Sequence, residues 1–133
     1  MHQTVCALLM SATLLTSTQS SAPSDWVGVW QAELDGQPST ILTLAADDGT
    51  LQGTLVLNGI SRDGGTPHIT VRETHALLHP ALSGTRLSFA VKGVRGSSTT
   101  MNFTVELTAH DRAELHCLSC GDDSPKVEIT KQD

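Results

Sequence analysis

Residues 26–59 constrain the fold of this chain more than any other stretch. They contain three short apolar runs, at residues 26–34, 40–46 and 51–57. An Asp-Gly turn and an Asp-Asp-Gly turn separate these runs. Asp-Gly between alternating apolar residues is a strong hairpin signal, because glycine readily adopts the positive φ that a tight β-turn needs. The stretch therefore predicts the start of an antiparallel β-meander.

The rest of the chain continues this pattern with apolar and polar residues in alternation, which is the period of a β-strand. Further alternating segments lie at residues 69–71, 87–91, 101–107, 113–117 and 127–129. Together with the three runs above they make eight candidate strands, separated by turn-forming residues. Eight antiparallel strands, each with one apolar face and joined by short sequential turns, favour an all-β up-and-down barrel. A β-sandwich is the alternative.

The longest predicted connection, residues 74–85, carries three leucines. It is interpreted in two ways: as a lid over one barrel mouth, or as a loop whose leucines fill the core.

The N-terminal residues 1–22 are predicted to be a signal peptide. An apolar segment at residues 5–15 is too short to span a bilayer and is followed by a polar tract that ends in small residues. The alternative is a disordered or membrane-anchored N-terminus. Residues 23–133 are then expected to form a single exported β-barrel domain, secreted or periplasmic, with no membrane insertion after cleavage.

The charge balance limits the classes of partner. The chain carries 8 basic and 14 acidic residues, for a net charge of −6, and only four aromatic residues, Trp26, Trp30, Phe89 and Phe103. Such a chain lacks the basic surface that binds nucleic acids or anionic membranes. It also has too few aromatic side chains for bases to stack on. Neither partner is expected.

Gly28-Val29-Trp30, at the start of the first predicted strand, resembles the calycin signature shared by lipocalins, avidins and several bacterial barrel inhibitors. The likeness to avidin extends through residues 39–41 and 48–54. It implies an eight-stranded barrel in which Trp30 points inward and closes one end, while Gly28 lets another segment cross closely. Where avidin-like proteins place polar biotin ligands, this chain has Ala32 and Leu55. Biotin binding is therefore not expected, and no cofactor is predicted.

The first functional hypothesis is a non-enzymatic binding protein of lipocalin-like type, holding a small apolar ligand at the barrel mouth. Its candidate ligand-binding residues are Trp30, Glu73, His75, Leu77 and Leu78. If the strand containing residues 69–71 continues, Glu73 and His75 project to the same inward side. If residues 74–79 are helical instead, His75 and His79 have zinc-ligand spacing but lack the acidic neighbour of metalloproteases. A third interpretation makes them solvated loop residues, and no metal site is predicted.

Two alternatives remain open. The chain is similar in size and Gly-x-Trp motif to small bacterial inhibitors of metalloproteases, whose mode implies binding through the free N-terminal segment, here residues 21–25. A secreted protein-binding module is therefore the second hypothesis. The third and weakest is a hydrolase that uses Glu73 and His75, since a carboxylate beside an imidazole can act as a general base.

Cys117 and Cys120 flank two residues in a CxxC arrangement. A redox CxxC needs a lowered thiol pKa, but the two acids that follow at positions 122 and 123 should raise it. A zinc site would need further ligands at suitable spacing. In an exported protein the pair instead predicts a structural disulfide between the last two strands, provided that the four residues form a turn.

Overall fold

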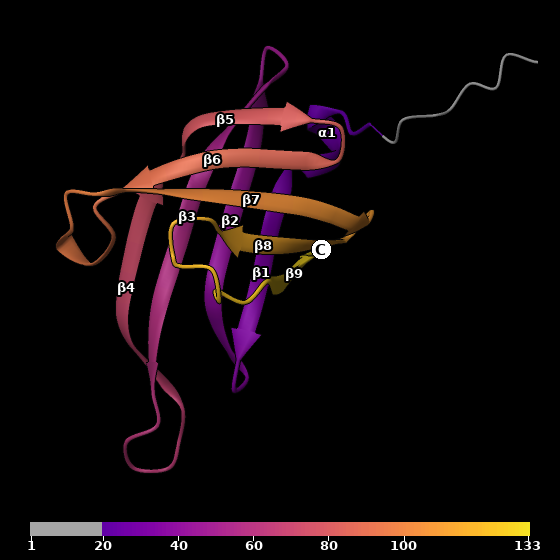
Figure 1. Cartoon of the computed structure of the whole chain (residues 1–133). Coiled ribbons are helices and arrows are strands. Elements are labelled where there is room, and N and C mark those ends of the chain that lie inside the picture. Colours follow the sequence, from indigo (N-terminus) through magenta and orange to yellow (C-terminus); the bar gives the residue numbers. More distant parts are fainter. Residues whose placement is uncertain (1–19) are drawn as a thin grey trace, which may run out of the picture.

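The computed structural model describes residues 20–133, so most of the predicted signal peptide lies outside the described residues. Figure 1 shows a chain built almost entirely of β-strands. The elements are α1 (Pro23–Trp26), β1 (Gly28–Leu34), β2 (Gln37–Asp47), β3 (Thr50–Ser61), β4 (His68–Ala76), β5 (Leu78–Ser83), β6 (Arg86–Lys92), the 3-10 helix η1 (Val94–Gly96), β7 (Thr100–Ala109), β8 (Arg112–Cys117) and β9 (Val127–Lys131). The two helices of the described chain, α1 and η1, are too short to cross a bilayer.

All nine strands of the described chain belong to one antiparallel sheet, in the order β4-β3-β2-β1-β9-β8-β7-β6-β5. The sheet curls into a half-barrel, in which β5–β8 run across the direction of β1–β4 (Figure 1). The last strand, β9, lies between β1 and β8, and β4 and β5 form the two edges. The predicted all-β antiparallel class is confirmed. The predicted closed barrel of eight strands is wrong, because the sheet has nine strands and two free edges.

The additional strand, β5, lies within the predicted 74–85 connection. Its partly buried residues Leu78, Pro80 and Leu82 alternate with exposed residues, which is strand periodicity. The sequence did not predict this strand, because a proline after His79 is typical of a loop. In the structure His79 has a positive φ of 50°, and the register with β6 is broken here. β4 also continues to Ala76, so residues 74–79 are not helical and the zinc-ligand spacing of His75 and His79 does not apply.

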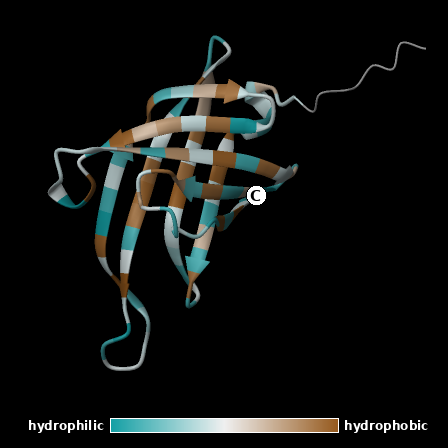
Figure 2. Cartoon of the chain, viewed as in Figure 1, coloured by the Kyte–Doolittle hydropathy of each residue, from teal (hydrophilic) through white to brown (hydrophobic). Residues whose placement is uncertain are grey.

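The concave side of the sheet is filled by apolar side chains. Figure 2 shows hydrophobic and hydrophilic residues alternating along the strands, as the sequence predicts. Trp30 is 0% exposed, and the prediction that it points inward is confirmed. Aromatic pairs lie within this interior, Trp26 against Trp30 and Phe89 against Phe103. The core residues are Trp26, Trp30, Ala32, Leu42, Leu44, Leu51, Leu55, Leu87, Phe89, Val91, Phe103, Val105, Ala113, Leu115 and Ile129.

The close approach predicted at Gly28 involves β9. Gly28 has a φ of 138°, and a Cβ added there would lie 3.0 Å from Cε of Lys131. The Lys131 ammonium lies 5.6 Å from the centroid of the Trp30 ring, and it donates a hydrogen bond to the Asp25 carbonyl at 3.2 Å. Gly28 therefore leaves room for a lysine that caps Trp30 through a cation–π contact.

The predicted disulfide is present between Cys117 and Cys120. The two intervening residues form a turn, which brings the Cα atoms within 5.4 Å of each other. The disulfide closes the start of the connection between β8 and β9, where the sequence placed it.

Candidate functional site

Glu73 and His75 lie on the same face of β4, opposite Leu57 and Leu55 of β3. Since Leu55 belongs to the core, this is the concave face of the sheet. The two side chains are mostly sheltered, at 25% and 10% exposure respectively. The interpretation in which the strand continues through these residues is therefore the one that the structure supports.

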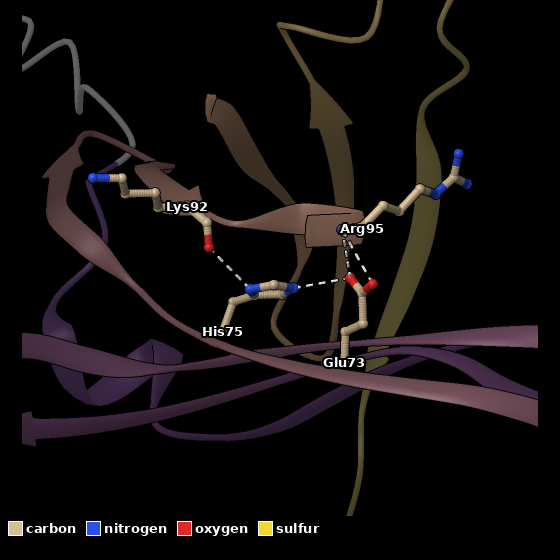
Figure 3. Close-up of polar contacts among 4 residues, drawn as sticks. All are labelled: Glu73, His75, Lys92 and Arg95. Carbon is tan, nitrogen blue, oxygen red and sulfur yellow. Dashed lines mark hydrogen bonds and ion pairs between the residues drawn. The ribbon is translucent and has the colours of Figure 1, made fainter. Parts of the chain in front are cut away.

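Four residues form a polar cluster at this place, shown in Figure 3. Nε2 of His75 lies 3.1 Å from Oε2 of Glu73, and Nδ1 of His75 lies 3.1 Å from the Lys92 carbonyl oxygen. The backbone N–H of Arg95 donates to both carboxylate oxygens of Glu73, at 3.1 Å each. The cluster thus joins β4 to the end of β6 and to η1.

The geometry favours a charged carboxylate at Glu73. The hydrogen bond from the Arg95 backbone N–H is the largest cause that lowers the pKa of Glu73, followed by the hydrogen bond with His75. Both ring nitrogens of His75 face oxygen atoms, one of the Glu73 carboxylate and one of the Lys92 carbonyl. Arg95 has a φ of 55°, the left-handed conformation in which its N–H is directed at Glu73.

This arrangement braces the fold. Both ring nitrogens of His75 face oxygen atoms of the protein itself, and neither Glu73 nor His75 lines a cavity found in the described chain. Two opposed parts of the curled sheet are joined instead, at the corner where β4 passes into β5. The cluster is a polar fastening between β4 and β6.

The other predicted ligand-binding residues do not gather around a space. Trp30 is enclosed in the core, Leu77 is partly buried and packs against the core, and Leu78 is the first residue of β5. Two surface cavities stand out in residues 20–133, and none of the five predicted ligand-binding residues lines either of them. Ligand binding by these residues stays a prediction.

The larger cavity, of about 550 Å³, lies between residues 20–25 and the β7–β8 turn. Its walls are mostly polar, and they include Ser21, Asp25, His110 and Lys131. The smaller one, of about 200 Å³, lies on the outer face of β6–β8. No group of three or more His, Cys, Asp or Glu in the described part of the chain is arranged to hold a metal ion.

The N-terminal segment at residues 21–25 is docked against the half-barrel. The backbone N–H and hydroxyl of Ser21 donate to the Gly84 carbonyl at 2.8 and 2.6 Å. Nε1 of Trp26 donates to the Ser21 hydroxyl at 2.8 Å, and Lys131 bonds to the Asp25 carbonyl. The segment therefore lacks the free extended form that the inhibitor hypothesis assumes.

The outer face of the sheet carries a row of acids that sequence reasoning did not find. The register places Glu106, Glu114 and Glu128 directly opposite one another on β7, β8 and β9. Like charges in such positions are destabilising. Only the first is compensated within the described chain: the Thr85 hydroxyl and then Arg86 lower the pKa of Glu106 by hydrogen bonding. The row was not predictable because its members come together only through the register of β7, β8 and β9.

The two sheet edges differ in how they are protected. β5 is six residues long, contains Pro80 and has a break in its register, all of which discourage pairing with another strand. β4 is nine residues long and contains no proline. Its register with β3 is broken only near its start, where Thr70 is an extra residue, and it is regular from Val71 to Ala76. The regular part of β4 is the more available edge.

These features define the protein as a small antiparallel β half-barrel with a packed interior, a short disulfide loop and an edge strand, β4, whose pairing with β3 is regular from Val71 to Ala76. Comparison with models of protein families, with curated protein sequences and with solved structures found no significant match.

Proposed function

We propose that this chain is an exported, non-enzymatic protein-binding module that binds its partner through the surface of the half-barrel. The observation that carries this proposal is the filled interior. The large side chains around Trp30, including Leu42, Leu55 and Leu87, are 0% exposed, so the concave side is already occupied by the protein itself. Binding is then left to the surface.

The small-ligand hypothesis has less support. A drug-sized ligand needs a concave, mostly apolar pocket of about 300 Å³ or more. The cavity that reaches this size lies beside α1 and is walled mainly by polar residues, away from Glu73 and His75. A hydrolase is also less supported, because both ring nitrogens of His75 are engaged in the fastening.

Export and calycin kinship belong to the same proposal. Residues 1–22 have the character of a signal peptide, and a disulfide such as Cys117–Cys120 persists in oxidising compartments. The inward position of Trp30 and the close contact between Gly28 and Lys131 support kinship with the calycins.

The test is to express the full chain in its own cells and to isolate the exported form with and without chemical cross-linking. We expect a cross-linked partner polypeptide, an N-terminus near residue 23, and no stoichiometric small molecule by native mass spectrometry. An apolar compound bound at one equivalent, with no partner protein cross-linked, would support the small-ligand hypothesis instead. Recovery of the chain in the cytoplasm with residues 1–22 retained would contradict export.

A further inference from the structure

We infer that the free edge of β4, from Val71 to Ala76, is a docking site for an extended acidic segment of a partner protein. This inference rests on the protein-binding function proposed above and names the surface and the kind of partner. The recognition mode is β-augmentation, in which an extended peptide adds a strand to an exposed sheet edge through main-chain hydrogen bonds.

The backbone of β4 offers unused hydrogen-bonding groups at this edge. In an antiparallel pair, alternate residues bond to the neighbouring strand, and the residues between them direct N–H and C=O to the other side. The Leu77 N–H donates to the Gly53 carbonyl at 3.0 Å, which assigns the inward role to residues 75, 73 and 71. Arg72, Thr74 and Ala76 therefore direct their backbone groups away from β3. No hydrogen bond to these groups occurs within residues 20–133.

The same residues are open to solvent. Arg72, Thr74 and Ala76 are all exposed, and the contacts of β4 with β6 and η1 run through Glu73 and His75 on the other face. In Figure 1, β4 lies at the outer side of the β1–β4 group as an edge strand of the sheet, and the end of β6 with the loop after it passes its upper end. The fastening through Glu73 and His75 already holds this part of β4 in place, so less conformational entropy is lost when a partner binds.

The charges around this edge select an acidic partner. Arg72 lies on β4, and the Glu73–His75 fastening brings the backbone of residues 92 and 95 to the same strand. Figure 3 shows the side chains of Lys92 and Arg95 extending away from Glu73. These three cations take part in none of the ion pairs found in the described chain. In a protein of net charge −6, Arg72, Lys92 and Arg95 outnumber the Glu73 carboxylate that lies among them, so this edge is complementary to carboxylates of a partner.

The side chains of β4 also suggest the pattern of the partner. Val71 lies on the concave face and is 54% exposed, whereas Arg72 lies on the opposite face. A strand paired with β4 would place alternate side chains on these two faces. The partner segment should therefore alternate apolar residues, which would cover Val71, with acidic residues, which would meet Arg72.

A second copy of this chain is a poorer occupant of the edge. Symmetric antiparallel pairing of two β4 strands would bring two copies of the same cationic edge, each with Arg72, Lys92 and Arg95, against each other. Like charges in adjacent cross-strand positions are destabilising. Charge complementarity therefore favours an acidic segment from a different protein.

The experiment uses the exported full chain and an eight-residue peptide of alternating Val and Glu as the probe, titrated by isothermal calorimetry at low salt. A peptide of alternating Val and Lys is the control ligand. We expect binding of the acidic peptide only. Thr74→Pro removes one outward N–H and changes no charge, so binding should weaken about tenfold or more, whereas Thr74→Val keeps the N–H and should bind like the original chain. Arg72→Glu should reduce binding of the acidic peptide and allow the basic one to bind.

Four results would overturn the inference: no binding of the acidic peptide, equal binding of both peptides, undiminished binding by folded Thr74→Pro, or a dimer by sedimentation that Thr74→Pro separates. Should Thr74→Pro not fold, the charge reversal at Arg72 decides the same question. A cross-linked natural partner that binds Thr74→Pro normally would overturn this inference and leave the proposed function standing. The finding of a bound apolar compound and no partner would overturn the proposed function itself.

Discussion

Glu73 illustrates how much one side chain contributes to the shape of this protein. Its carboxylate receives the N–H of Arg95 in η1 and contacts the ring of His75, whose other nitrogen faces the Lys92 carbonyl at the end of β6. The sequence indicates that Glu73 and His75 share a face, since they are two residues apart in a strand. It gives no sign of Arg95, because that contact depends on a left-handed conformation 22 residues further along the chain.

The first prediction concerns Glu73→Gln. The folded-state pKa of Glu73 lies below its ordinary value of 4.5, so its stabilising contribution is complete above that value. The contribution is lost as the pH falls through the lowered pKa. We therefore expect the variant to unfold at lower urea concentration than the original chain at pH 7. The two urea midpoints should converge in acid.

The matched control is Asp47→Asn, which replaces an exposed carboxylate at the end of β2 that has no hydrogen-bonding or ion-pair partner within the described chain. Urea midpoints across the acid range check both variants. A Glu73→Gln chain whose midpoint differs from the original by the same amount at every pH would contradict the assigned role.

The second prediction concerns Gly53, where β3 approaches β2 closely. A Cβ at this position would overlap the carbonyl oxygen of Thr43, a backbone atom that cannot move aside cheaply. We expect Gly53→Ala to lower the free energy of unfolding by about 1–3 kcal/mol. Gly59→Ala is the control, because its Cβ would meet only ordinary contacts near 3.4 Å. Equal thermal midpoints for the two variants would refute this explanation.

At the scale of the elements, the strands with uninterrupted alternation were predictable and the interrupted one was not. Segments such as residues 101–107 place every second residue in or near the core, so their period is visible in the sequence. In β5, His79 and Pro80 interrupt the period and the register, and the same residues look like a loop. The disulfide was predictable because it depends only on a local turn.

The third prediction concerns the disulfide between β8 and β9. Replacing both Cys117 and Cys120 with Ser should cost about 2 kcal/mol or less, since a loop of so few residues restricts the unfolded chain only slightly. The far-UV circular dichroism of the folded protein should not change, and denaturant unfolding gives the free energy. Complete unfolding of this variant at 25 °C would show that the disulfide carries more of the fold than its loop length allows.

At the scale of the molecule, the inward apolar face was predictable but the incomplete closure was not. Alternation determines which side chains face the core, and Trp30 is buried as the Gly-x-Trp motif indicates. Closure depends on whether β4 and β5 pair, which is decided by the corner around Leu77 and by the fastening at Glu73. These contacts join residues whose meeting no local pattern encodes.

The fourth prediction follows from the continuous core. Buried residues from β1–β3 and from β6–β9 form one cluster, so the two parts of the half-barrel should unfold together. Trp26 and Trp30 are both fully buried on this core and report on its disruption by fluorescence. Urea transitions followed by tryptophan fluorescence and by far-UV circular dichroism should coincide. Separate transitions would show that the two parts are independent units.

The position of β9 between β1 and β8 has a consequence for how the protein is made. β1 acquires its second neighbour through only two residue pairs, Trp30 with Lys131 and Gln31 with Thr130, and it cannot do so until residues 127–131 have left the ribosome. Until then the sheet stays in two parts, β1–β4 and β5–β8. The seam that β9 makes with β1 and β8 is then the last contact of the sheet to become possible.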